Sequence, residues 1–167
     1  MTTFIIAAIT ADGFIGKNSS HLADWTSKED KRFFVEMTKK AGVVIMGQNT
    51  FETIGKPLPG RLNIVYSRDK QHEGVETTQK PAQELLDDLR GRGYQEVAIG
   101  GGATIYTMFL EQKLVDKLYL SIEPVLFGKG ITLFNKEFDT KLELVSVKKL
   151  GEQTVLLEYN VLKTYSQ

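Results

Sequence analysis

The sequence predicts an α/β sandwich with a mostly parallel sheet and antiparallel strands at its C-terminal edge. Short, β-branched apolar runs alternate with amphipathic segments of helical period over residues 4–111. Two longer runs of alternating hydrophobicity, residues 142–149 and 154–162, flank Gly151-Glu152 and are typical of an antiparallel hairpin. The length of 167 residues suggests one domain, spanning residues 1–167.

Composition excludes several classes of protein. With no cysteine, the chain has no disulfide scaffold, thiol nucleophile or cysteine-bound metal. Lys and Arg (21 residues) balance Asp and Glu (21 residues), so we expect no nucleic-acid partner held by phosphate contacts. The two histidines, His21 and His72, form no H-E-x-x-H motif, and no carboxylate cluster has metal-ligand spacing. We therefore expect no catalytic metal.

Nothing in the sequence suggests export or membrane insertion. The apolar run at residues 4–9 has no basic segment before it and is closed by Thr10 and Asp12, unlike a signal peptide. No stretch approaches the ~18 to 20 apolar residues that a membrane span requires. We expect a cytoplasmic protein with no membrane partner.

The first elements are predicted from their apolar runs and their ends. Residues 4–9 are continuous and β-branched, as in a buried strand. Ser27 and Asp30 have the spacing of a capping box, which predicts a helix over residues 28–40. A second buried strand is expected at residues 43–46.

Proline and glycine define the middle of the chain. A short helix at residues 48–54 should end at Gly55, because the two prolines in residues 56–60 exclude a helix there. Strands are expected at residues 62–66 and, more briefly, at residues 74–78.

The second half repeats the strand and helix alternation. We expect an amphipathic helix at residues 82–89, a buried strand at 96–99 leading into three glycines, and a helix at 103–111. A strand at residues 117–123 should then lead to a glycine-containing loop at 127–130.

Asp30 is the first candidate for chemistry. It precedes Phe34 by four residues and Met37 by seven, so the three share one helix face. One interpretation is a first-turn acid that serves the helix dipole or the capping box. The other is a partly buried carboxylate with a raised pKa, which handles a proton or a cationic heterocycle. Trp25, the only tryptophan, would alone be interpreted as a packing residue.

Two strand-to-helix turns could bind a phosphate-bearing cofactor, because consecutive glycines permit close approach of the backbone and a helix N-terminus favours anions. The segment that begins with Gly100-Gly101-Gly102 is neither a dinucleotide fingerprint, since Ile105 stands where the third glycine would be, nor a Walker A motif. A plain tight turn is the alternative. The two turns are Gly47-Gln48-Asn49-Thr50 and Gly100-Gly101-Gly102. Ser67-Arg68, at the end of the strand predicted at residues 62–66, could bind the same cofactor.

Arg61 follows a rigid Pro-Leu-Pro-Gly segment. A preorganised arginine suits bidentate recognition of a carboxylate. A surface arginine after a turn is the alternative interpretation.

At this point the motifs resemble a known family. Residues 46–68, MGQNTFETIGKPLPGRLNIVYSR, closely resemble the signature block of the dihydrofolate reductases. The likeness continues to about Glu123. The other matching segments are Ile6-Ala7-Ala8 with residues 12–16 (first strand and active-site loop), Trp25, Asp30 and Phe34 in W-x4-D-x3-F spacing, and residues 99–106 (second cofactor segment).

The resemblance implies a dihydrofolate reductase-like three-layer sandwich with about eight strands. It implies NADPH-dependent reduction of 7,8-dihydrofolate to tetrahydrofolate, with hydride delivered to C6 of the pterin. Asp30 would hold the pterin and promote protonation at N5. Trp25 would order a water near that acid, and Ser121 would match the hydroxyl residue beside it.

The same resemblance assigns binding residues. Arg61 would pair with the α-carboxylate of the substrate, Arg68 would contact the 2′-phosphate of NADPH, and Gly101-Gly102 would carry a cis peptide. The remaining folate-pocket residues would be Ile6, Ala7, Ala8, Phe34, Ile54 and Leu58. The remaining cofactor residues would be Ile15, Gly16, Gly47, Gln48, Asn49, Thr50, Ser67, Gly100, Ala103, Thr104, Ile105 and Tyr106.

Some features depart from the family pattern. The loop from Asp12 to Trp25 looks longer than in common bacterial members and lacks their proline before the tryptophan, and Lys31 stands where an apolar residue is usual. Residues 123–134 look like the riboflavin-pathway reductases, which share the fold but reduce a ribosylaminouracil phosphate. Lys31 or Arg32 could meet that phosphate. A non-catalytic nucleotide-binding relative is a third alternative, and a monomer or a homodimer is expected.

Overall fold

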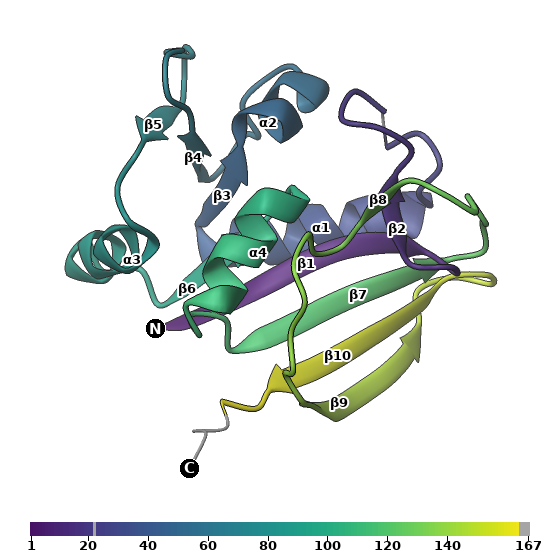
Figure 1. Ribbon diagram of the computed structural model, residues 1–167. Helices are drawn as coiled ribbons and strands as arrows, with labels where there is room; N and C mark the ends of the chain where they lie inside the picture. Colours follow the sequence, from purple (N-terminus) through teal and green to yellow (C-terminus); the bar gives the residue numbers. More distant parts are fainter. Residues whose placement is uncertain (22, 164–167) are drawn as a thin grey trace.

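The computed structural model describes residues 1–21 and 23–163 and contains an eight-stranded sheet (Figure 1). Its strands are β1 (Thr2–Thr10), β3 (Val43–Gly47), β4 (Leu62–Tyr66), β5 (Glu76–Thr78), β6 (Glu96–Ile99), β7 (Lys117–Glu123), β9 (Leu142–Lys149) and β10 (Val155–Val161). They lie in the order β5-β4-β3-β6-β1-β7-β10-β9. From β5 to β7 the neighbours pair in parallel, whereas β10 pairs antiparallel with both β7 and β9. The predicted sheet and its antiparallel C-terminal edge are confirmed.

Four helices among the described residues cover the sheet in two outer layers. The helices α1 (Lys28–Ala41) and α2 (Gln48–Ile54) lie on one face, and α3 (Ala82–Gly91) and α4 (Ala103–Glu111) lie on the other (Figure 1). Successive side chains of a strand point to opposite faces of the sheet, so each strand contributes to both layers of the core. In β1, for example, Ile6 packs on the α1 side and Ile5 on the α4 side. This arrangement is the predicted three-layer sandwich.

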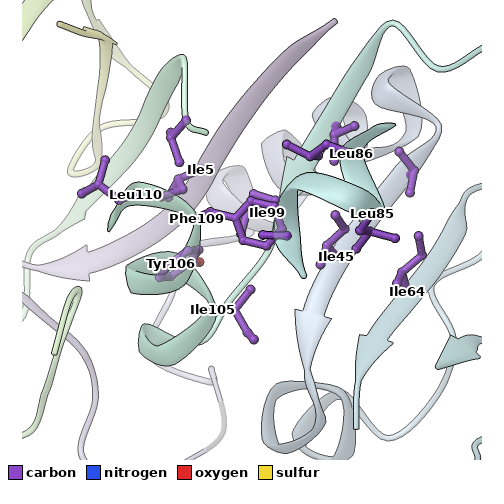
Figure 2. Packing of buried hydrophobic residues seen from close by; sticks show 14 of the residues in the cluster. Ile5, Ile45, Ile64, Leu85, Leu86, Ile99, Ile105, Tyr106, Phe109 and Leu110 are labelled. Atoms are coloured by element: carbon purple, nitrogen blue, oxygen red, sulfur yellow. The ribbon is translucent and has the colours of Figure 1, made fainter. Parts of the chain in front are cut away.

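The larger core lies under α3 and α4. Figure 2 shows Phe109 of α4 inserted toward the sheet, with Leu85 of α3 over Ile45 and Ile64. Phe109 and Ile45 have no exposed surface. This packing fixes α4 on the sheet, and with it the glycine turn that joins α4 to β6.

The predicted antiparallel C-terminal hairpin of β9 and β10 is confirmed. β9 forms the edge of the sheet, and its ladder with β10 shifts register between Glu158 and Tyr159, which leaves Val145 as an extra residue in β9. Val147 is 58% exposed. The bulge and the terminal Lys148 and Lys149 are features that discourage pairing of an edge strand with another chain.

Two short strands lay outside the prediction. β2 (Phe14–Gly16) pairs with β8 (Ile131–Thr132) in a separate two-stranded sheet. Each strand is too short to show a period of two, so its sequence carried no signal. The predicted strand at 74–78 is shorter than expected and starts at Glu76, because Gly74, with φ of 78°, forms a turn.

The longest helix in residues 1–21 and 23–163 is α1, with 14 residues. No helix in that part of the chain has both the length and the apolar character needed to cross a membrane.

Candidate active site

A large cavity, about 1280 Å³ in volume, opens at the carboxyl ends of β1, β3, β4 and β6. In a parallel sheet these ends lie at one edge, where ligands usually bind. Residues of the 15–26 loop and the first turns of α1 line one part of the cavity. α2, the segment at residues 78–81 and the start of α4 line the rest. The lining therefore includes residues from all three layers of the fold.

Asp30 presents a buried carboxyl group to this cavity. α1 begins after Ser27, whose Oγ accepts a hydrogen bond of 3.1 Å from the Asp30 backbone N–H. The Asp30 side chain is only 9% exposed, and the Ser121 hydroxyl hydrogen-bonds its carboxylate. Burial raises the pKa of Asp30 above its ordinary value, with a further rise from the charge of Glu123 and opposing effects of Ser121 and Lys31. Asp30 therefore holds a proton more readily than an exposed carboxyl group.

Glu123 is a second buried acid, which the sequence interpretation did not single out. Its Oε1 accepts hydrogen bonds from the Ser27 N–H (3.1 Å) and the Ser27 hydroxyl (2.9 Å). Its Oε2 accepts from the Thr154 hydroxyl at 3.0 Å, and the residue is 2% exposed. The available signal was its position two residues after Ser121 in a predicted strand, which places both side chains on the α1 face.

The carboxyl ends of β3 and β6 are joined by backbone hydrogen bonds at glycines. The Gly47 N–H donates to the Gly101 carbonyl, and the Gly100 N–H donates to the Ile45 carbonyl, both at 2.8 Å. Gly101 has φ of 123°, where other residues are strained, and a methyl group on Gly100 would come within 3.0 Å of Val44. The predicted cis peptide between Gly101 and Gly102 is confirmed.

The N-terminus of α4 opens into the cavity beside this junction. Its N-cap residue, Gly102, supplies no side-chain hydrogen bond to the first turn. A helix N-terminus carries partial positive charge from its backbone N–H groups. The Thr50 hydroxyl lies within 3.3 Å of the point where a Cβ on Gly102 would be. These groups fit a phosphate of a dinucleotide.

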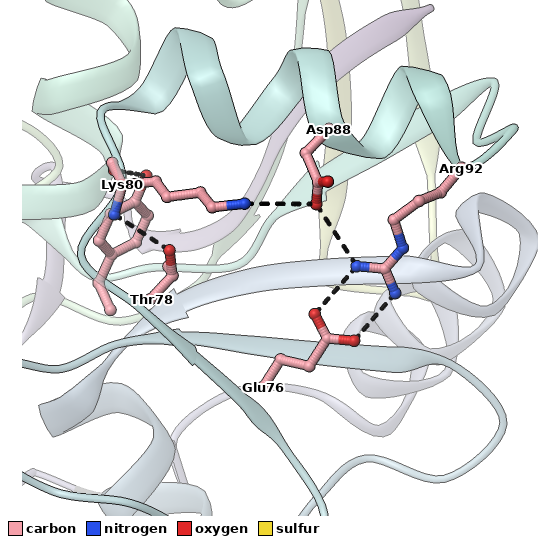
Figure 3. Close-up of polar contacts among 6 residues, drawn as sticks. Glu76, Thr78, Lys80, Asp88 and Arg92 are labelled. Carbon is pink, nitrogen blue, oxygen red and sulfur yellow. Dashed lines mark hydrogen bonds and ion pairs between the residues drawn. The ribbon is translucent and has the colours of Figure 1, made fainter.

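The segment at residues 78–81 forms another wall of the cavity and is fixed to α3 (Figure 3). The Tyr66 hydroxyl donates to the Lys80 carbonyl at 3.0 Å, and the Lys80 ammonium lies 3.9 Å from Asp88. Arg92 makes two hydrogen bonds of 2.9 Å to Glu76 and an ion pair of 3.6 Å with Asp88. The Glu76 partner raises the pKa of Arg92. Each exposed pair contributes little alone, but together they connect β5 with α3.

Arg61 contacts a residue that lines the cavity, Val35, without lining the cavity itself. Its Nη1 donates to the Val35 carbonyl at 3.3 Å, while its buried Nε has no partner in the described part of the chain. Burial lowers the pKa of Arg61. Asn63 holds this loop by donating to the carbonyls of Leu58 (2.8 Å) and Arg61 (3.0 Å). The arginine is thus held by its neighbours, and its unpartnered Nε–H is buried.

Comparison with known proteins fits this geometry. The family model described as dihydrofolate reductase matches residues 2–157. The chain belongs to the dihydrofolate reductase family. Dihydrofolate reductase type 3 of Salmonella typhimurium is 40% identical over 125 residues, which cover 72% of this chain and 71% of that protein.

Solved structures extend the comparison. The dihydrofolate reductase of Enterococcus faecalis, complexed with NADP(H) and RAB-propyl, has a TM-score of 0.75 and 27% identity over 96% of both chains. A diaminohydroxyphosphoribosylaminopyrimidine deaminase/5-amino-6-(5-phosphoribosylamino)uracil reductase of Thermotoga maritima has a TM-score of 0.78 and 18% identity. That match covers 96% of this chain and 56% of the other chain, and it shows a shared fold.

The structure brings most of the residues expected from the dihydrofolate reductase resemblance to one cavity. Arg61 and Ser121 do not line it. Lys31, raised as a candidate phosphate ligand, does line it, and Arg32 does not. The predicted residues that line the cavity are Ile6, Ala7, Ala8, Ile15, Gly16, Trp25, Asp30, Phe34, Gly47, Gln48, Asn49, Thr50, Ile54, Leu58, Ser67, Arg68, Gly100, Gly101, Gly102, Ala103, Thr104, Ile105 and Tyr106. Their individual roles stay predictions.

The loop expected to resemble the active-site loop of dihydrofolate reductases is anchored on Phe127. The Phe127 ring centre lies 5.2 Å from that of Trp25, 5.6 Å from that of His21 and 5.3 Å from the Lys17 ammonium. The Asp12 carboxylate accepts hydrogen bonds from the backbone N–H groups of Phe127 (3.2 Å) and the next residue (2.6 Å). The predicted loop at 127–130 thus acts as a support for the cavity wall.

The burial of Asp30 predicts a dependence of stability on pH. Since folding raises its pKa, the folded state binds a proton more tightly than the unfolded state. Stability from this group is full below the unfolded pKa and is lost as pH rises through the folded pKa. Asp30→Asn should therefore raise the melting temperature at about pH 7, with the gain shrinking toward about pH 4.

Differential scanning calorimetry of the wild type and of Asp30→Asn at the two pH values measures this change in melting temperature. Asp139→Asn, which changes an exposed aspartate, should leave the melting temperature nearly unchanged at both. A melting temperature lowered by Asp30→Asn at about pH 7 would contradict the prediction.

Proposed function

We propose that this protein reduces 7,8-dihydrofolate to tetrahydrofolate with NADPH, delivering hydride to C6 of the pterin while Asp30 assists protonation at N5. The observation that carries this function is one buried carboxyl group, Asp30, at a cavity that also contains a free helix N-terminus. Burial raises the pKa of Asp30, which is the direction expected of a carboxyl group that passes a proton to a substrate.

The substrate side of the proposed site is apolar. Ile6, Phe34, Ile54 and Leu58 line the cavity around Asp30 and would receive the flat pterin ring and its aromatic linker. Water is poorly accommodated by such walls, which strengthens the interaction of a cationic or protonated heterocycle with the carboxylate. Arg61, beside Leu58, would pair with the carboxylate of the glutamate tail.

The cofactor side of the proposed site is built for anions. NADPH, when bound, would supply the hydride. The N-terminus of α4 and the Thr50 hydroxyl would hold its pyrophosphate. Arg68, exposed at the cavity after β4, would contact the 2′-phosphate, with the buried Ser67 hydroxyl beside it.

Lys31 supports a second candidate function. Lys31 directly follows Asp30 in α1 and lines the cavity, where a substrate phosphate could reach it. A ribosylaminouracil phosphate carries such a group and lacks the glutamate tail that Arg61 would bind. The two functions therefore differ in which cation the substrate requires.

The proposed function is tested by following NADPH oxidation with dihydrofolate and, separately, with the ribosylaminouracil phosphate. We expect turnover with dihydrofolate only. Asp30→Asn should lower it by ~10²- to 10⁴-fold at neutral pH, with partial recovery in acid, where solvent supplies the proton. Turnover confined to the ribosylaminouracil phosphate would establish the second candidate instead. Near wild-type turnover of Asp30→Asn would refute the role of the acid.

Arg61→Ala should raise KM for dihydrofolate by ~10- to 100-fold and leave KM for NADPH nearly unchanged, because only the substrate loses a charged hydrogen bond. Steady-state kinetics with each substrate varied in turn measure both constants. Arg32→Ala, which removes an exposed cation of α1 away from the cavity, is the matched control. Equal increases in both constants would exclude this role for Arg61.

Arg68→Ala should narrow the preference for NADPH over NADH, because the 2′-phosphate is the part of the cofactor that NADH lacks. The ratio of kcat/KM for the two cofactors measures this preference. Arg90→Ala, an exposed change in α3, should leave the ratio as in the wild type. If Arg68→Ala also leaves it so, another cation holds the phosphate.

A further inference from the structure

The start of α1 departs from an ordinary capping box in one bond. In a capping box the N-cap hydroxyl accepts from the backbone of the third helical residue, and the acid at that position accepts from the N-cap N–H. Ser27 and Asp30 make the first bond, at 3.1 Å. The second donor, the Ser27 N–H, goes to Glu123 of β7 instead. The Asp30 carboxylate is thereby left for Ser121 and the cavity.

Glu123 is well held for this purpose. Three donors reach its two oxygens, two from Ser27 and one from the Thr154 hydroxyl in the turn between β9 and β10. At 2% exposure, the carboxylate is kept in place by hydrogen bonds and not by solvent. It therefore connects the helix that carries Asp30 with β7 and with the C-terminal hairpin.

We propose that Glu123 is a positioning residue: by accepting both donors of Ser27, it keeps the Asp30 side chain out of the helix cap and directed into the cavity. The inference rests on the proposed function only where turnover is the readout. The direction of the Asp30 side chain is a property of the protein alone.

The titratable groups that interact with Asp30 come from three elements. Lys31 belongs to the same helix, Glu123 to β7, and the buried Tyr106 to α4. The Ser121 hydroxyl adds a hydrogen bond that favours the ionised form. Removing the charge of Glu123 therefore lowers the pKa of Asp30. Removing its acceptor oxygens as well offers Asp30 the Ser27 N–H, which lowers that pKa further.

The test compares Glu123→Gln, which keeps an acceptor oxygen, with Glu123→Leu, which removes it. The readouts are an NMR titration of the Asp30 carboxyl carbon in ¹³C-aspartate-labelled protein, assigned with Asp30→Asn, and the pH profile of turnover with dihydrofolate. For Glu123→Gln we expect a titration midpoint lower by roughly 0.5 to 1 pH unit and a matching shift in the falling limb of activity. Acid-side turnover should stay close to the wild type.

For Glu123→Leu we expect a larger fall in the midpoint and a ~10- to 100-fold loss of kcat, with KM for NADPH unchanged. Thr154→Val is the matched control, since it withdraws one donor from Glu123 and leaves both Ser27 bonds. Its melting temperature should fall, whereas the Asp30 midpoint and the pH profile should not move.

A midpoint and a kcat of Glu123→Leu that match those of Glu123→Gln would overturn the inference, because only Glu123→Leu removes the acceptor of the Ser27 N–H. An equal shift in Thr154→Val would also overturn it. If Glu123→Leu does not fold, the Ser27 amide proton of the wild type decides, since a chemical shift that follows the titration of Asp30 would place that N–H on Asp30 and refute the positioning role. The titration needs no substrate, so a shifted midpoint in a protein that is inactive on dihydrofolate would refute the proposed function and uphold the positioning role.

Discussion

The junction between the carboxyl ends of β3 and β6 is the constraint on which the rest of the cavity depends. Two backbone hydrogen bonds, from Gly47 to Gly101 and from Gly100 to Ile45, bring these strands together without intervening side chains. α2 then leaves β3 toward one face of the sheet, and α4 leaves β6 toward the other. The cavity lies where the two helices diverge. A side chain at Gly100 would disturb this junction, because its Cβ would come within 3.0 Å of Val44.

The same cavity contains an acid, Asp30, whose burial disfavours its ionised form. Asp30 is buried, and within the described residues its carboxyl group interacts with the Ser121 hydroxyl, whereas the carboxylate of Glu123 accepts three hydrogen bonds. At the start of α1, Ser27 thus donates hydrogen bonds to the carboxylate of Glu123 and none to that of Asp30. Hydrogen bonds satisfy Glu123, which has a structural role, whereas burial leaves the ionised form of Asp30 poorly solvated and so raises the affinity of its carboxyl group for a proton.

The sequence predicted the elements whose period is long enough to read, and missed what depends on distant pairing. The strand around Ile45, the helix begun by Ser27 and the hairpin around Gly151 were foreseen from local pattern. β2 and β8, which pair Phe14 with Thr132, were not, because two or three residues carry no period. Most of the predicted site residues lie at the cavity, and they could be named because the family resemblance supplied them. Glu123 was overlooked because no local rule links it to Ser27, 96 residues earlier.

That separation has a consequence for how the protein is made. α1 ends at Ala41, yet its cap is completed by Glu123 and stabilised by Thr154. During synthesis the ribosome therefore releases the helix long before the groups that fix its first turn, and β1 must likewise wait for β6 and β7. Such distant contacts slow folding and delay completion of this cap until Thr154 has been synthesised. The nascent chain therefore carries Asp30 well before it carries the groups that fix the first turn of α1.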